Sequence, residues 1–139
     1  MNLLKTKKWM SVLLILGSVI LFSNFVEPLS DEEWVVPENF KNMKNPIAAD
    51  EESLEIGGEI YAKHCKSCHG KTGEGDGTKA EELDDFPGDF TEEEFASQTD
   101  GSLFYKTKEG RDDMPGFSKK IPDDEDIWHV VNYMRDFAN

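Results

Sequence analysis

Cysteine is nearly absent from this chain: its 139 residues include only Cys65 and Cys68, two residues apart. A structural zinc site usually needs about four ligands, often two such pairs, and no second pair exists. His64 and His69 could complete a zinc site only from positions crowded against the cysteines. A disulfide between Cys65 and Cys68 would close a very short, strained ring. These alternatives are therefore disfavoured.

Strand patterns and internal repeats are also lacking, and we expect no strand. Without a βαβ unit, a thioredoxin-like redox pair is disfavoured as well. Residues 70–77 contain four glycines. They have neither a preceding strand nor the Gly-Lys-Ser/Thr ending of a phosphate-binding loop. We expect an irregular loop there that wraps the edge of a bound group.

Basic residues are scarce. The chain has 15 Lys and Arg against 29 Asp and Glu, a net charge of -14. Residues 31–139 hold 12 basic and 28 acidic residues. So much negative charge argues against binding to nucleic acid or to anionic lipid. It favours docking to basic surfaces of partner proteins, or it is simply a solvated surface.

The two cysteines belong to the segment Cys65-Lys66-Ser67-Cys68-His69. Two thiols two residues apart, followed at once by an imidazole, are typical of c-type haem attachment. The thiols of Cys65 and Cys68 would add to the haem vinyl groups, and His69 would lie under the iron as a ligand. One such segment predicts one haem c.

The N-terminal region resembles an export segment. Lys5, Lys7 and Lys8 precede the uncharged residues 9–26, and this order is typical of export. No clear small-x-small cleavage site follows and no cysteine is available for lipidation, so we favour an uncleaved signal-anchor over a cleaved signal peptide. The lysines would stay in the cytoplasm, which places the C-terminal part outside. We predict an anchor or signal at 1–26, a linker at 27–50 and a domain at 51–139.

Helical periodicity dominates the domain. We expect a helix from about residues 50–53 to Cys65, whose Gly57 and Gly58 imply close approach of another helix. A short helical turn fits 78–83, a helix fits 101–108, and the last helix begins at Asp123. Its apolar stripe contains Ile127, Val130, Val131 and Met134. The aromatic residues expected in the core, lining the haem or the helix crossing, are Phe86, Phe90, Phe104, Phe117 and Trp128.

Haem iron has a second axial position, which Met, His or no residue can fill. His64 lies on the attachment segment and cannot reach round the ring, and His129 is expected to be exposed. Met134 is expected in the core. Met114 lies in a loop before Pro115, whose ring restricts the backbone. We predict Met114 as the sixth ligand, a choice that raises the reduction potential and closes the iron to substrates.

With these residues identified, the chain resembles the small bacterial class I cytochromes c from about residue 54 to 137. Four stretches show the resemblance. They are Gly57-x-x-x-Tyr61-x-x-x-Cys65-x-x-Cys68-His69-Gly70, then Gly73-x-Gly75-Asp76-Gly77, then Asp100-Gly101-x-Leu103-Phe104 with Glu109-Gly110-Arg111-x-x-Met114-Pro115-x-Phe117, and Trp128-x-Val130-Val131-x-Tyr133-Met134-Arg135.

The resemblance implies an all-α cytochrome c fold of three to five helices around one covalent haem, with crossing N- and C-terminal helices. Gly57 and Tyr61 would meet Val130 and Tyr133 at the crossing. It also implies Met114 on the iron and a carbonyl near Pro87 that accepts the Nδ1–H of His69. Arg111 would either pair with a haem propionate or stay exposed.

These features predict a monomeric electron carrier rather than an enzyme. Its place would be the outer, periplasmic face of a bacterial inner membrane, anchored there or soluble in the periplasm, where it would serve redox partners of a respiratory chain. One alternative is a dedicated haem subunit of a larger oxidase or dehydrogenase. Another is an open-site haem enzyme or sensor, which would have no methionine on the iron.

Overall fold

The computed structural model describes residues 33–138, and the chain separates into residues 1–34 and 35–139. The second unit is mostly helical, which confirms the all-α prediction. Its two long helices are α3 (Glu51–His64) and α7 (Asp124–Asp136), and α6 (Asp100–Glu109) is next in length. Single turns form α2 (Glu38–Lys41), α4 (Lys66–His69) and α5 (Glu93–Ala96), with a 3-10 turn at Ala80–Glu82. The described part thus has six α-helices, more than the expected three to five.

Capping residues fix where the long helices begin. The Asp50 carboxylate accepts a hydrogen bond from the Ser53 amide at the start of α3, at 2.9 Å. Asp123 does the same for the Glu125 amide at the start of α7, at 3.0 Å. Each cap supplies a partner to an amide that the helix itself leaves unbonded. Both beginnings agree with the sequence-based expectation.

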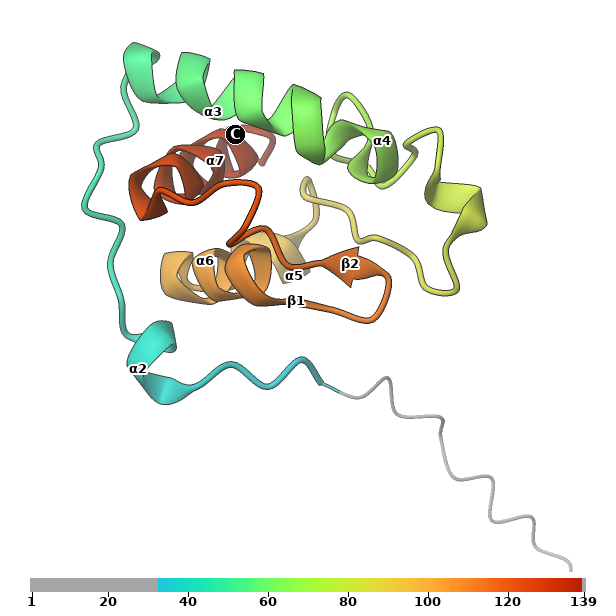
Figure 1. The fold of residues 1–139 in the computed structure, drawn as a ribbon, viewed down its shortest axis with the longest axis horizontal. Helices are drawn as coiled ribbons and strands as arrows, with labels where there is room; N and C mark the ends of the chain where they lie inside the picture. The colour runs from blue at the N-terminus through green and yellow to red at the C-terminus, as the bar shows by residue number, and fades with distance from the viewer. Residues whose placement is uncertain (1–32, 139) are drawn as a thin grey trace, which may run out of the picture. The chain divides into compact units, whose positions relative to one another are not determined.

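Helices α3 and α7 pack directly against each other (Figure 1). A Cβ atom on Gly57 would lie 2.2 Å from the carbonyl oxygen of His129, so only glycine allows this approach. The Tyr61 ring packs on the Tyr133 ring, with centroids 5.3 Å apart. The expected close approach at Gly57 is therefore confirmed, with the backbone of α7 as the group it meets.

Helix α6 packs on α7 and leads into a short hairpin. Gly110 ends α6 with φ of 71°, a conformation that glycine adopts without strain. Strand β1 (Gly110–Arg111) then pairs antiparallel with β2 (Met114–Pro115), with Arg111 opposite Met114. The expectation of no strand was wrong here, because two-residue strands are too short to show an alternating pattern.

Residues 35–50 fall within the second unit although the sequence suggests a linker over 27–50. The Phe40 ring packs on Tyr105 of α6, with centroids 4.8 Å apart. The Asn45 side chain donates to the Trp128 carbonyl at 3.1 Å and to the Asn132 side chain at 2.8 Å. This segment is thus bonded to α6 and α7, while the division of the chain at residues 26 and 50 stays a prediction.

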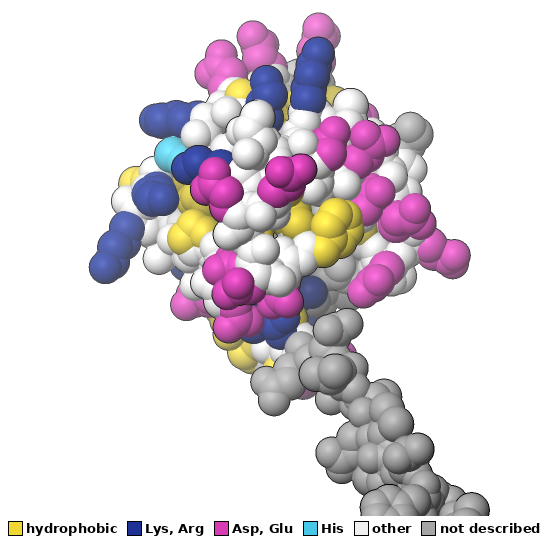
Figure 2. Space-filling model, turned by 90° about the vertical axis from the view of Figure 1, so that its right-hand side faces the viewer, with side chains coloured by type: hydrophobic (Ala, Val, Ile, Leu, Met, Phe, Trp, Pro, Cys, Tyr) yellow, Lys and Arg dark blue, Asp and Glu magenta, His cyan; other side chains and the backbone are white. Residues whose placement is uncertain are grey.

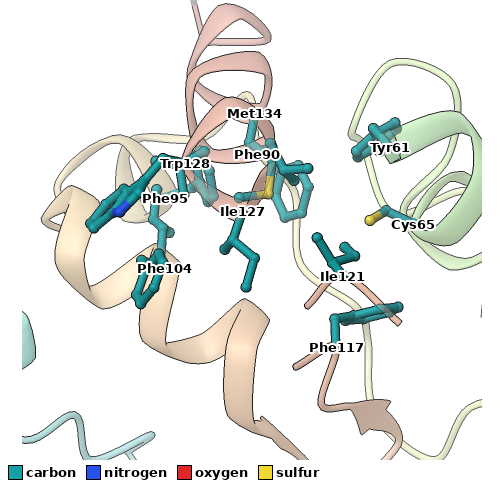
Figure 3. Packing of buried hydrophobic residues seen from close by; sticks show 13 residues of the cluster. Tyr61, Cys65, Phe90, Phe95, Phe104, Phe117, Ile121, Ile127, Trp128 and Met134 are labelled. Carbon is teal, nitrogen blue, oxygen red and sulfur yellow. The ribbon is translucent and has the colours of Figure 1, made fainter. Parts of the chain in front are cut away.

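One apolar cluster joins these elements (Figure 3). Phe90, Phe104, Phe117 and Trp128 are buried in it, as expected. Phe86 is 70% exposed, so it does not belong to this core, and the expectation that it lines the haem stays a prediction. No helix within 33–138 has the length and apolar character needed to cross a membrane. The predicted anchor or signal at 1–26 lies outside the described residues.

Candidate haem site

The attachment segment is one helical turn that follows α3. The amides of Cys68 and His69 both donate to the Cys65 carbonyl, at 3.1 and 3.0 Å. Cys65 is buried and Cys68 is half-buried, and both are free thiols. In Figure 3 the Cys65 side chain points from α3 toward the apolar cluster. Burial raises the pKa of the Cys65 thiol to about 12, and the neighbouring Cys68 adds to the rise.

His69 lies inside the molecule, with 8% of its surface exposed. Its ring stacks on Phe90, with centroids 4.6 Å apart. Burial lowers the pKa of His69 to about 4, which keeps the imidazole neutral, as an iron ligand must be. The Pro87 backbone opposes this shift, yet Nδ1 has no partner within ordinary hydrogen-bond geometry. A backbone group of Pro87 thus lies beside the ring, as the resemblance implies, although outside strict hydrogen-bond geometry.

The glycine-rich loop binds the attachment segment from outside. The amide of Gly75 donates to the His69 carbonyl at 3.0 Å, and that of Gly77 donates to the Cys68 carbonyl at 3.1 Å. The Tyr61 hydroxyl donates to the Gly70 carbonyl at 2.9 Å. A Cβ atom on Gly77 would lie 2.4 Å from the Ser67 carbonyl, so the loop can come this close only with glycine. These bonds hold the backbone of the attachment segment in place.

Met114 lies in the β hairpin. It is half-buried and packs against the same apolar cluster that contains Cys65. The neighbouring Asp113 carboxylate accepts a hydrogen bond from the Asp84 amide at 2.6 Å. This bond joins the hairpin to the loop that precedes Pro87. Met114 therefore lies next to a residue that is bonded to this loop.

The donor set fits a c-type haem. Two free thiols, a neutral imidazole and a soft thioether are present, and Cys65, Met114 and, through its stack on Phe90, His69 lie in or against one aromatic-rich cluster. Such apolar surroundings suit a porphyrin, and each donor type is known as a haem attachment or ligand group. Among residues 33–138, no group of three or more His, Cys, Asp and Glu side chains could hold a metal ion.

The other candidate residues have different roles. His129 is buried on α7, where its Nδ1 lies 2.9 Å from the Ser53 hydroxyl, so the expectation that it is exposed was wrong. Asn132 also bonds to Ser53, at 2.9 Å. Sequence reasoning missed this polar cluster, although an asparagine among apolar residues of a helix is a signal for it. The Arg111 side chain forms an ion pair with Asp112 at 3.0 Å.

Comparison with known proteins agrees with this geometry. Residues 52–134, more than half of the chain, match the family model described as cytochrome c oxidase, cbb3-type, subunit III. A chain of the reducing HAO-like protein complex of Kuenenia stuttgartiensis has a similar structure, with a TM-score of 0.61 and 28% identity. The likeness covers 68% of this chain and 47% of that chain, so the protein spans about half of its structural relative. No curated protein matches the sequence.

Proposed function

The chain belongs to the family of cbb3-type cytochrome c oxidase subunit III domains, and from this premise we propose that it is a monohaem electron carrier with His69 and Met114 on the iron. Membership of this family means a class I-like c-type cytochrome and haem-based electron transfer. We further propose that the haem is attached covalently through Cys65 and Cys68. It also assigns the protein to electron transfer between respiratory partners rather than to catalysis.

The observation that best supports the ligand pair is the convergence of two unrelated segments on one cluster. His69 comes from the turn after α3 and stacks on Phe90, while Met114 comes from β2 and packs against the same cluster. Bound haem would supply an iron that gains and loses one electron. The protein would keep both ligands in place, because His69 is held by the glycine-rich loop and Met114 by the hairpin. A thioether ligand also raises the reduction potential.

Replacement of Met114 tests this proposal. The ferric wild-type protein should show the weak near-infrared absorbance band that marks methionine on haem iron. In Met114→Ala we expect this band to disappear and the reduction potential to fall, because the thioether favours reduced iron. The matched control is Met134→Leu, a buried methionine of α7, in which the band should persist. A band that survives in Met114→Ala would refute the assignment.

Covalent attachment has a separate test. The mass of the denatured wild-type chain should include the haem, because thioether bonds survive denaturation. Replacement of both Cys65 and Cys68 by Ser should give a denatured chain without haem. If haem stayed with that variant, or left the denatured wild type, attachment through these residues would be refuted.

We also propose export of the domain to the periplasmic face of a bacterial inner membrane. The support is the order of Lys5, Lys7 and Lys8 before the uncharged residues 9–26, which we assign to a retained signal-anchor. Mass analysis of the protein recovered from membranes would test retention. A mature chain that begins near residue 27 would instead mean a cleaved signal peptide.

A dedicated subunit of a larger oxidase is the second candidate. The family description names an oxidase subunit, and the similar structure belongs to a multi-protein complex. Purification in mild detergent distinguishes the two functions. A fixed subunit stays with its complex at high salt, whereas a transient carrier that docks through charges dissociates as salt rises.

A further inference from the structure

Arg135 of α7 is a charged residue that points into the protein. Charged side chains cover much of the face that Figure 2 shows, where they project into solvent. The Arg135 side chain, in contrast, is only 25% exposed. Burial of a charged group is costly unless the group is paired and hydrogen-bonded. The partners of Arg135 therefore indicate which part of the fold this residue holds in place.

These partners lie at the end of α5 and the start of α6. The guanidinium of Arg135 forms an ion pair with the Asp100 carboxylate, at 2.9 and 3.0 Å. It also donates to the Ala96 carbonyl at 3.0 Å and to the carbonyls of Phe95 and Gln98. Helix α5 is a single turn without a side-chain N-cap, and one turn has little stability alone. Because Arg135 binds carbonyls that the turn leaves unbonded, it holds α5 against α7.

The same guanidinium begins a series of stacked flat groups. It lies over the ring of Phe95, with 5.7 Å between the guanidinium carbon and the ring centroid. Phe95 stacks on Phe90, and Phe90 stacks on His69, with centroid distances of 4.5 and 4.6 Å. The interplanar angle is 28° in both ring stacks. We call Arg135, Phe95, Phe90 and His69 the stacked column, of which Figure 3 shows the two phenylalanines.

The stacked column is buried except at its arginine end. His69 and Phe90 are each 8% exposed, and Phe95 is 6% exposed. Rings at these separations are in contact, since packed carbon atoms approach to about 3.5–4.0 Å. A ring in the column that turned out of its plane would push an edge into its neighbour. A displacement at one end of the column therefore reaches the other end.

The His69 ring is contacted both at an edge and on a face. A backbone group of Pro87 lies beside the ring edge. A hydrogen bond at that edge would restrain one atom, but the ring could still swing about it. The ring of Phe90 lies on the face of the imidazole and opposes this swing. Such outer contacts orient the ligands of a metal and tune its properties.

We propose that Arg135 is a positioning residue for His69, which acts through Phe95 and Phe90 to set the plane of the imidazole. This inference rests on the proposed ligation of haem iron by His69. Helix α7 packs closely on α3, so Arg135 gives the stacked column a fixed outer end. The rings between its two ends can then adjust only together.

The NMR spectrum of the ferric holoprotein reports the plane of the imidazole. The planes of the axial ligands decide how unpaired electron density spreads over the haem, so they displace the haem methyl signals by different amounts. Arg135→Gln removes the flat charged group. We expect some methyl signals to move downfield and others upfield, because a turned ligand redistributes this density without removing it. The near-infrared band of methionine ligation should persist.

Unchanged methyl signals in Arg135→Gln would overturn the positioning role and leave electron transfer standing. Loss of the near-infrared band in this variant would mean that it loses a ligand, which would overturn the role as well. A ferric wild type without displaced methyl signals would instead overturn the ligation of haem iron on which the inference rests.

Phe95→Leu tests the route from Arg135 to His69. Leucine keeps an apolar side chain but offers no flat face to Phe90. We expect the methyl signals to move in the same directions as in Arg135→Gln. The double variant should move them no further than the larger single change, because two breaks in one column are not additive. Additive changes would overturn the proposal. If Arg135→Gln gave no folded holoprotein, unchanged signals in Phe95→Leu would overturn it.

Thr99→Ala is the matched control. The Thr99 hydroxyl caps α6 by accepting a hydrogen bond from the Ser102 amide at 3.2 Å. Its loss should loosen the segment that Arg135 binds, and so lower the urea midpoint of unfolding, without replacing a member of the column. The methyl signals should keep their wild-type positions. Methyl changes equal to those of Arg135→Gln would indicate general loosening and overturn the positioning role.

The ferrous holoprotein offers a direct measurement of the same contact. Nuclear Overhauser effects between the ring protons of His69 and Phe90 should be present in the wild type and in Thr99→Ala. They should weaken in Arg135→Gln, because the imidazole turns away from the phenyl face. Effects of equal strength in Arg135→Gln and in the wild type would overturn the proposal.

Discussion

The crossing of α3 with α7 and the surroundings of His69 are built differently. At the crossing, backbone meets backbone at Gly57, and buried polar groups such as Ser53 and His129 are bonded to each other. Around His69, the contacts are aromatic stacks, and the buried Nδ1 has no partner. The polar groups of the crossing are thus bonded within the polypeptide, whereas the segment that ends at His69 holds two free thiols beside a buried imidazole.

This difference explains how the fold supports its cofactor. An interface in which even a methyl group finds no room is rigid, because any shift would bring backbone atoms into contact. Cys65 ends α3, so the crossing sets the position of the attachment turn. The aromatic rings around His69 can then adjust to the haem while α3 and α7 stay packed together. Substitutions in the two regions should therefore change the unfolding free energy by different amounts and for different physical reasons.

Phe90→Ala should have the largest effect. Phe90 stacks on His69 and on Phe95, with centroid distances of 4.6 and 4.5 Å. Removal of a buried phenyl ring typically costs about 3–5 kcal/mol of unfolding free energy. Urea unfolding of the holoprotein would measure the loss. A loss below about 1 kcal/mol would mean that the haem region contributes little packing energy, and the contrast drawn above would fail.

Gly57→Ala should be next. The new methyl group would lie 2.2 Å from the His129 carbonyl oxygen, and a backbone atom cannot move aside cheaply. We expect a loss of about 3 kcal/mol in the same unfolding experiment.

Gly58→Ala is the matched control for Gly57→Ala. Its methyl group would lie 3.0 Å from the Tyr133 ring, which is a side chain that can give way. Alanine also favours a helix over glycine by about 1 kcal/mol, so the net change should be small. Equal losses in the two variants would show that the close approach is not specific to Gly57.

Phe86→Ala should have the smallest effect. The side chain is 70% exposed, and surface substitutions usually change the unfolding free energy by less than about 0.5 kcal/mol. The loss of unfolding free energy should thus be several-fold smaller for Phe86→Ala than for Phe90→Ala. A large loss at Phe86 would mean that bound haem covers this ring, which would extend the site to the loop that contains Pro87.

Local signals predicted much of the fold. Asp50 and Asp123 were expected at helix starts and are the capping residues, since a cap depends on neighbours within three residues. The attachment motif is also local. Its residues, together with Met114, stay predictions as attachment points and ligands, while the structure places Cys65, Met114 and, through Phe90, His69 at one cluster.

Phe86 and His129 show where such reasoning fails. Both assignments relied on residue type: an aromatic ring was expected inside and a histidine outside. The fold reverses both, because the Phe86 loop lies at the surface and Ser53 gives His129 a buried partner. A short window of sequence does not show which distant residues will pack against a side chain in the fold.

The sequence by itself determined the chemistry of this protein: one attachment motif, one methionine before a proline, a helical class and a strongly negative net charge. Those properties are set by residue type and short spacing. Only the tertiary structure decided where the charged side chains lie and which residues from distant parts of the sequence come together. Lys63 and Lys120 are 57 positions apart in the numbering, yet they line one hollow because α3 and the segment after the hairpin pack together.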